Sequence, residues 1–186
     1  MSVKRRDQLV GKIIETQPVL RTFVRQLPSD LTAGSWDLLA YSFQRGFEVM
    51  LDRAWSDPPG LLLRPLLMLW RQSIELAIKA ALNEIAGRVD PKLGHNISRL
   101  FEQLLKDRAA AGCSDDNELT RDVIAMIALV QSFDPFADRF RYPTTKRGER
   151  FEGIDADLDE LFQAHWIIVT WCEGAAMEVR ETRLEG

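Results

Sequence analysis

The chain has 186 residues, of which 46% are hydrophobic, and a formal net charge of −4. This length and composition are typical of one compact domain covering residues 1–186, and they argue against a disordered chain. The acidic balance excludes indiscriminate binding of nucleic acid over the whole surface, although it leaves room for a local basic patch.

Two distant cysteines, Cys113 and Cys172, form neither a disulfide framework nor a zinc-binding spacing, which favours a reducing compartment. The N-terminus starts basic but lacks the apolar core of a signal peptide. The most apolar run, residues 61–70, carries a charge and a proline and is too short to span a bilayer. We therefore expect a soluble, cytoplasmic protein without membrane contact.

Two helices are predicted in the N-terminal part, residues 1–58. The first covers residues 7–27, and Pro18 is expected to kink or split it. Residues 28–30 break this helix. The second helix begins after Ser35, a suitable N-cap, and ends around Trp55.

The central part, residues 61–134, opens with the longest strongly helical stretch of the chain, residues 61–86. Its apolar residues recur at spacings of three and four on more than one side, so the helix needs packing partners on several sides. Arg71, Glu75 and Lys79 follow one another at i, i+4 and predict a plus–minus–plus ladder on one face. We expect this helix at the centre of the fold.

Three more helices follow the central one. One opens at His95 and Asn96, the next follows the caps at residues 114–116, and the last covers residues 155–182. No strand-like alternation or repeat is present. The sequence therefore predicts an all-α protein, an up-and-down bundle of about six helices.

Residues 135–153 form the only long stretch without helical periodicity, and long loops in compact domains are often functional. Cations outnumber acids there, in contrast to the whole chain, and aromatic residues lie between them. Arginine forks match phosphate oxygens and aromatic faces stack on bases, so this loop is a candidate binding site. A solvated loop that pairs with the acidic start of the last helix is the alternative. The cations are Arg139, Arg141, Lys146, Arg147 and Arg150.

His95 and His165 are the only histidines, so any imidazole acid–base step must use one of them. His95 stands at a helix start. His165 lies on the apolar stripe of the last helix, where a histidine is usually a hydrogen-bonded core residue. Neither has the carboxylate spacing of a metal site, and no phosphate loop or nucleophile elbow is present, so we expect no metal and no cofactor.

Three stretches, in this order, resemble the pattern of HEPN-domain proteins, the higher-eukaryote and prokaryote nucleotide-binding superfamily. They are IELAIKAAL at residues 74–82, GHNISRLFEQL at residues 94–104 and FRYP at residues 140–143. The family pattern has an E-x-x-x-K-A-L-L helix, an H-D-L-x-x-L helix and an R-Y-P turn. The matching residues are Glu75, Lys79, His95, Arg141, Tyr142 and Pro143.

The resemblance implies an all-helical, usually homodimeric protein in a bacterial setting. Many members are metal-independent RNases of toxin–antitoxin, abortive-infection or phage-defence systems, and others are non-catalytic partners of small nucleotidyltransferases. The RNase members carry an arginine four to six residues before a histidine on one helix. This chain has no such pair, because Arg88 precedes His95 by seven residues and no arginine stands at that spacing before His165.

Three hypotheses follow, and they leave open whether the protein is an enzyme. The first is a HEPN-like nucleotide- or RNA-binding or accessory module, whose partner is RNA, a nucleotide, or a protein such as a nucleotidyltransferase or antitoxin. The second is a divergent RNase with His95 and Arg71 as its catalytic residues. The third is a helical protein-interaction scaffold. The predicted binding residues are Glu75, Lys79, Arg139, Arg141, Tyr142, Lys146 and Arg147.

Overall fold

The computed structural model describes residues 32–56, 60–145 and 147–185. The chain divides into two compact units, Met1–Ala33 and Gly34–Gly186. The boundary follows the helix-breaking residues 28–30. The helix predicted at residues 7–27 lies outside the described residues.

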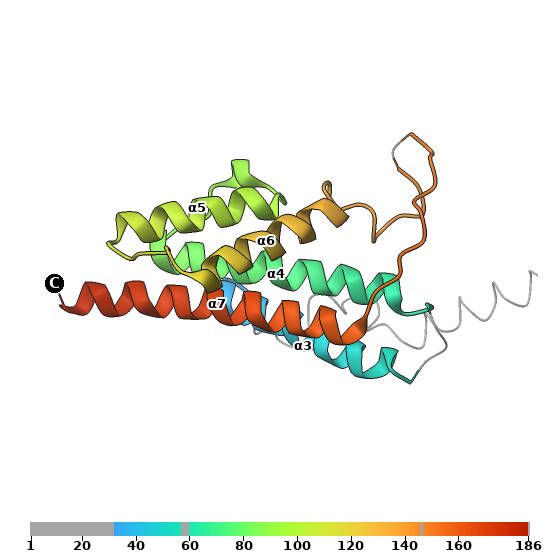
Figure 1. Cartoon of the computed structure of the whole chain (residues 1–186), viewed down its shortest axis with the longest axis horizontal. Helices are drawn as coiled ribbons and strands as arrows, with labels where there is room; N and C mark the ends of the chain where they lie inside the picture. Colours follow the sequence, from blue (N-terminus) through green and yellow to red (C-terminus); the bar gives the residue numbers. More distant parts are fainter. Residues whose placement is uncertain (1–31, 57–59, 146, 186) are drawn as a thin grey trace, which may run out of the picture. The chain divides into compact units, whose positions relative to one another are not determined.

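The described part of the chain is all-helical, as predicted (Figure 1), and each helix expected beyond residue 34 is present. Within the described residues the only bridge between extended segments joins Thr144 and Arg150. None of the described helices combines the length and the apolarity that a bilayer span requires. The helices are α3 (Trp36–Ala54), α4 (Leu63–Ala86), α5 (Ile97–Ala110), α6 (Glu118–Phe133) and α7 (Leu158–Glu185), with a 3-10 turn at Pro91–Leu93.

Local chemistry fixes where the helices begin and end. Ser35 caps α3 by accepting a hydrogen bond from the Leu38 amide, as predicted. The cap of α6 is Asn117, slightly later than the acidic stretch suggested, because its side chain accepts from the amide of Thr120. Helix α4 ends at Gly87, whose φ of 69° suits glycine best.

Helix α4 lies at the centre of this unit. It packs against α3, α5 and α7, and α6 covers the side formed by α5 and α7. Burial of each large apolar side chain contributes about 1.5–3 kcal/mol, so this core is the main source of stability. Fourteen of the 24 residues of α4 are buried, among them the charged residues Arg71 and Glu75.

Helices α4, α5 and α7 run in one direction, and α3 and α6 run in the other (Figure 1). The indole of Trp70 donates to the Leu161 carbonyl, and Arg183 donates to the Ile85 carbonyl, so α4 and α7 lie side by side and parallel. Residues 87–96 return along α4 before α5 begins. This return places His95 beside the middle of α4 instead of beyond its end.

The predicted basic loop is folded into turns. The Asp134 side chain accepts hydrogen bonds from the amides of Asp138 and Arg139, at 2.8 and 3.0 Å. Residues 143–145 and 147–151 then lie in a short hairpin-like turn, held by the Thr144–Arg150 bridge and by the bond from the Phe151 amide to the Pro143 carbonyl. Lys146 lies outside the described residues.

Candidate functional site

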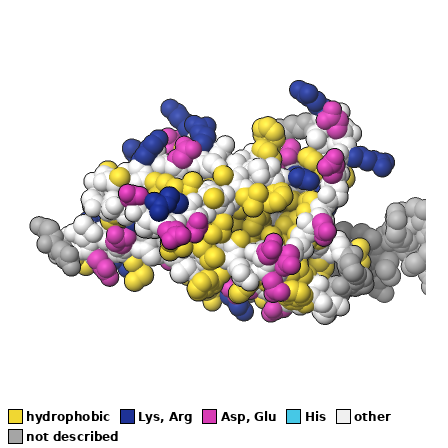
Figure 2. Space-filling view, viewed as in Figure 1, with side chains coloured by type: hydrophobic (Ala, Val, Ile, Leu, Met, Phe, Trp, Pro, Cys, Tyr) yellow, Lys and Arg dark blue, Asp and Glu magenta, His cyan; other side chains and the backbone are white. Residues whose placement is uncertain are grey.

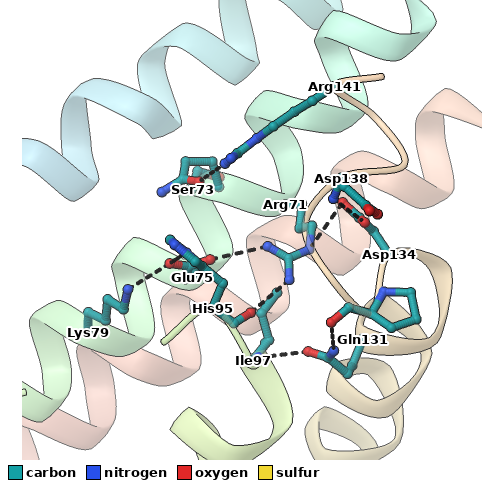
Figure 3. Close-up of polar contacts among 12 residues, drawn as sticks. Arg71, Ser73, Glu75, Lys79, His95, Ile97, Gln131, Asp134, Asp138 and Arg141 are labelled. Carbon is teal, nitrogen blue, oxygen red and sulfur yellow. Dashed lines mark hydrogen bonds and ion pairs between the residues drawn. The ribbon is translucent and has the colours of Figure 1, made fainter. Parts of the chain in front are cut away.

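A buried carboxylate, Glu75, is the centre of the site (Figure 3). Its side chain has no exposed surface. Its Oε1 accepts from Lys79 Nζ at 2.7 Å and from His95 Nδ1 at 2.8 Å, and its Oε2 accepts from Arg71 Nη1 at 3.2 Å. The predicted ladder therefore exists: Arg71 and Glu75 are buried, Lys79 is partly buried, and His95 joins them.

Arg71 connects three segments of the chain. Its Nη2 donates to the backbone carbonyl of His95 at 2.8 Å, which fixes the turn before α5. Its Nε lies 3.6 Å from Asp134 Oδ2, an ion pair without a hydrogen bond. Because Asp134 organises the following turn, Arg71 ties α4 both to α5 and to the loop (Figure 3).

The neighbouring cations keep Glu75 ionised. Burial by itself would raise the pKa of this carboxyl, because it removes water from the charged form. The hydrogen bonds and charges of Lys79 and His95 outweigh burial, so the pKa lies below its ordinary value. Glu75 is therefore an anion at neutral pH, buried beneath an ammonium and an imidazole.

His95 presents its ring to solvent while its inner edge is fixed. Its side chain is 59% exposed, although Nδ1 is bound to Glu75 and the backbone carbonyl is bound to Arg71. Because a carboxylate can only accept, Nδ1 carries a proton and the ring orientation is set. Across the described ranges, Nε2 has no hydrogen-bond partner.

The basic loop divides between two places. Arg141 is exposed and its Nη2 donates to Gln72 Oε1 at 3.3 Å, so it reaches the face of α4 next to Arg71. Arg139 instead donates to the Phe133 carbonyl at the end of α6. Arg147 lies in the hairpin turn, where its amide donates to the Thr145 hydroxyl. The loop cations thus do not form one patch.

Five of the predicted site residues lie together at α4, whereas Arg139 and Arg147 lie elsewhere in the loop. Arg71, Glu75, Lys79 and His95 are in direct contact, and Arg141 adjoins them. Tyr142 is 59% exposed, and its backbone carbonyl accepts from Arg64.

Sequence reasoning missed Asp134 and Arg64. Arg64 Nη1 donates to the carbonyls of Arg139 and Tyr142, at 2.9 and 3.0 Å, and holds the loop against α4. In the sequence, Arg64 was marked only as the charged residue within the apolar run at residues 61–70. The signal for Asp134 was a carboxylate directly after the last apolar residue of a helix and before a proline.

His165 lies in the core, as the sequence predicts. It is 2% exposed, its ring stacks on Phe47 with centroids 4.4 Å apart, and Nε2 is hydrogen-bonded to the Ser73 hydroxyl. Because that hydroxyl donates to the Trp70 carbonyl, Nε2 must be the donor in the bond to Ser73. Burial lowers the pKa of His165 to about 4, so it is neutral at pH 7 and is not placed to act as a base toward Ser73.

In the described ranges no three His, Cys, Asp or Glu side chains are grouped closely enough to hold a metal ion. In the comparisons with known proteins, no family model, no curated protein and no solved structure matches this chain. The resemblance to HEPN-domain proteins stays a prediction that depends on the three quoted stretches.

Proposed function

We propose that this chain is a HEPN-like RNA-binding or accessory module, of the kind used in bacterial defence or toxin–antitoxin systems. Its binding face consists of His95, Lys79 and Arg141 above the buried Arg71–Glu75 pair. The observation that carries the proposal is a convergence. Two of the three stretches that resemble the family meet at Glu75, and the third reaches Gln72 on the same helix, next to Arg71.

The placement of charge supports a binding role. A buried ion pair seldom stabilises a fold more than apolar side chains of the same size, because both charges lose water. Here the buried charges hold an exposed imidazole and an ammonium in fixed positions. Local departures from the usual burial rules are expected at functional sites.

The outer groups of this cluster suit a phosphodiester backbone, since Arg141 and His95 are exposed and Lys79 is partly buried, at 13% exposed. Arg141, Lys79 and His95 all donate hydrogen bonds, and phosphate oxygens only accept. The carboxylates of this region, Glu75 and Asp134, are buried and paired with cations, so they present little negative charge to a ligand. Because such contacts release counterions, RNA binding here is expected to weaken as salt rises.

A metal-independent RNase is the second candidate, and the Glu75–His95 pair is the observation that favours it. The carboxylate orients the ring, and Nε2 is left toward solvent as a general base. In that reaction Nε2 removes the proton of a ribose 2′-OH, and the oxygen attacks the adjacent phosphorus. The P–O5′ bond then breaks, giving a 2′,3′-cyclic phosphate and, after protonation, a 5′-OH. Arg141 would stabilise the phosphorane charge.

One experiment separates these candidates. Purified protein is incubated with labelled tRNA and messenger RNA in a chelator, beside His95→Ala and the core variant His165→Gln. A salt-sensitive mobility shift without cleavage supports the binding module. Cleavage by the wild type and by His165→Gln, but not by His95→Ala, supports the RNase. If the wild type neither shifts nor cleaves RNA, both are rejected and a protein-interaction scaffold is left.

A further inference from the structure

A hollow of about 690 Å³ lies between the C-terminal end of α6 and the loop that follows. Three phenylalanines line it, Phe133, Phe136 and Phe151. Figure 2 shows hydrophobic side chains gathered over α6 and α7, with basic side chains on the neighbouring loop. A volume of this size is in the usual range for small-ligand sites.

The turn at residues 134–138 holds Phe136 in an unfavourable position for an apolar ring. Phe136 is 81% exposed, and the next residue, Ala137, has a φ of 58°, which is uncommon for any residue with a Cβ. The turn persists because Asp134 accepts the amides of Asp138 and Arg139. Backbone strain of this kind is often kept at ligand sites.

The lining also carries an unpartnered donor. Arg139 Nε is buried and has no hydrogen-bond partner in the described part of the chain, although Nη1 donates to the Phe133 carbonyl. Arg147 and Arg150 line the hollow as well. The three arginines supply cations that can pair with a phosphate, whereas the buried Nε of Arg139 has no surface that a ligand could reach.

We propose that this hollow binds one nucleotide of a single-stranded RNA, an inference that rests on the proposed function. The base stacks on Phe136 and its neighbouring rings, which accept any base face. An arginine at the rim holds the phosphate. The carboxylates of Asp138, Glu149 and Glu152 also line the hollow, and they match the N–H donors on a base edge.

The charges distinguish this subsite from the face above Glu75. Among the described residues that line the hollow, three arginines are balanced by three carboxylates. Stacking of the base, and not attraction of the phosphate, is therefore expected to contribute most of the free energy of nucleotide binding. Binding of a mononucleotide should depend weakly on salt, whereas binding of RNA through Arg141 should depend on it strongly.

Equilibrium dialysis with labelled GMP and AMP tests the proposal, with ribose 5-phosphate as a probe that lacks the base. Phe136→Ala is compared with Leu129→Ala, an exposed apolar residue of α6 outside the hollow. Phe136→Ala should weaken nucleotide binding about tenfold, Leu129→Ala should leave it unchanged, and ribose 5-phosphate should bind far less well than GMP.

The proposal is overturned if ribose 5-phosphate binds as well as GMP, if neither mononucleotide binds, or if Phe136→Ala binds like the wild type. It is also overturned if Phe136→Ala changes only self-association in sedimentation, since the hollow is then a protein contact. The Arg141→Glu variant keeps the two claims apart. RNA binding that needs Arg141 but not Phe136 overturns the nucleotide site in the hollow and leaves the proposed function standing. GMP binding without RNA binding overturns the proposed function and, with it, the assignment of RNA as the ligand of the hollow, which would then be a mononucleotide site.

Discussion

Two buried arginines, Arg71 and Arg108, stand in similar surroundings and have different consequences. Each is 2–3% exposed and each meets two carboxylates. Arg108 uses all its nitrogens, for Nε bonds Asp115, Nη1 bonds the Ala175 carbonyl and Nη2 bonds Glu178. Arg71 leaves Nε without a hydrogen bond.

The difference lies in what each arginine holds. Arg108 also stacks on Trp171, 5.3 Å from the ring centroid, and so fastens α5 to α7. Its cluster ends in carboxylates. The cluster of Arg71 continues outward to His95 and Lys79, which are groups that can contact a ligand. Glu178, at the outer end of the Arg108 cluster, is 54% exposed, so exposure alone does not separate the two clusters. They differ in that the outer groups of Arg71's cluster donate hydrogen bonds and those of Arg108's cluster are carboxylates, which repel phosphate.

The largest effect should come from removing each arginine in turn. Arg108→Met and Arg71→Met should each lower the free energy of unfolding by about 3–5 kcal/mol, because each leaves paired charges without a partner. Urea unfolding measures this. At low temperature, where both variants are folded by circular dichroism, only Arg71→Met should lose RNA affinity. Equal RNA affinity in the two variants would remove the distinction between the clusters.

The pH dependence of the free energy of unfolding tests the burial of His165 in the core. The pKa of His165 is lowered from 6.5 to about 4, so folding favours its neutral form. That contribution is fully present above pH 6.5 and is lost as the pH falls toward 4, a loss of about 3 kcal/mol. His165→Gln should flatten the unfolding free energy over this range. A curve of unchanged slope in the variant would assign the acid sensitivity elsewhere.

Neutralising one carboxylate in each cluster is a milder test. Glu75→Gln should destabilise by about 2 kcal/mol and weaken RNA binding, because Lys79 and His95 lose the anion that orients them. Its counterpart Asp115→Asn should reduce stability without changing RNA affinity. Filter binding beside thermal unfolding measures both. RNA affinity that survives Glu75→Gln would mean that the orientation of His95 is irrelevant to binding.

The smallest effect on stability is expected at the surface. Arg141→Glu should change the unfolding free energy by less than about 0.5 kcal/mol, since the side chain is exposed. RNA affinity should nevertheless fall at least tenfold. Arg121→Glu, an exposed arginine at the start of α6 paired with Asp116, is the control and should bind RNA normally. Similar losses in both variants would point to a general charge effect.

The sequence predicted the parts of this molecule that depend on local spacing. The apolar periodicity of α4, the cap at Ser35 and the i, i+4 placement of Arg71, Glu75 and Lys79 all follow from helix geometry. The depth of Glu75 did not follow, because burial depends on α5 and the loop packing over α4.

Contacts between distant segments could not be predicted. His95 meets Glu75 only because residues 87–96 return along α4 and α5 runs parallel to it. A count of cations in the loop could not show that Arg141 turns toward α4 while Arg139 turns toward α6. The strained turn at Ala137 left no mark in the sequence either, since alanine has no preference for positive φ.

The most direct test of the central claim is the RNA-binding isotherm of the wild type and of Arg141→Glu, measured by fluorescence anisotropy over a range of salt in a chelator. The account predicts that the wild type binds, that its affinity falls with salt, and that the variant binds more weakly with a salt slope smaller by about one. A wild type that does not bind RNA, or two superimposable sets of curves, would contradict it.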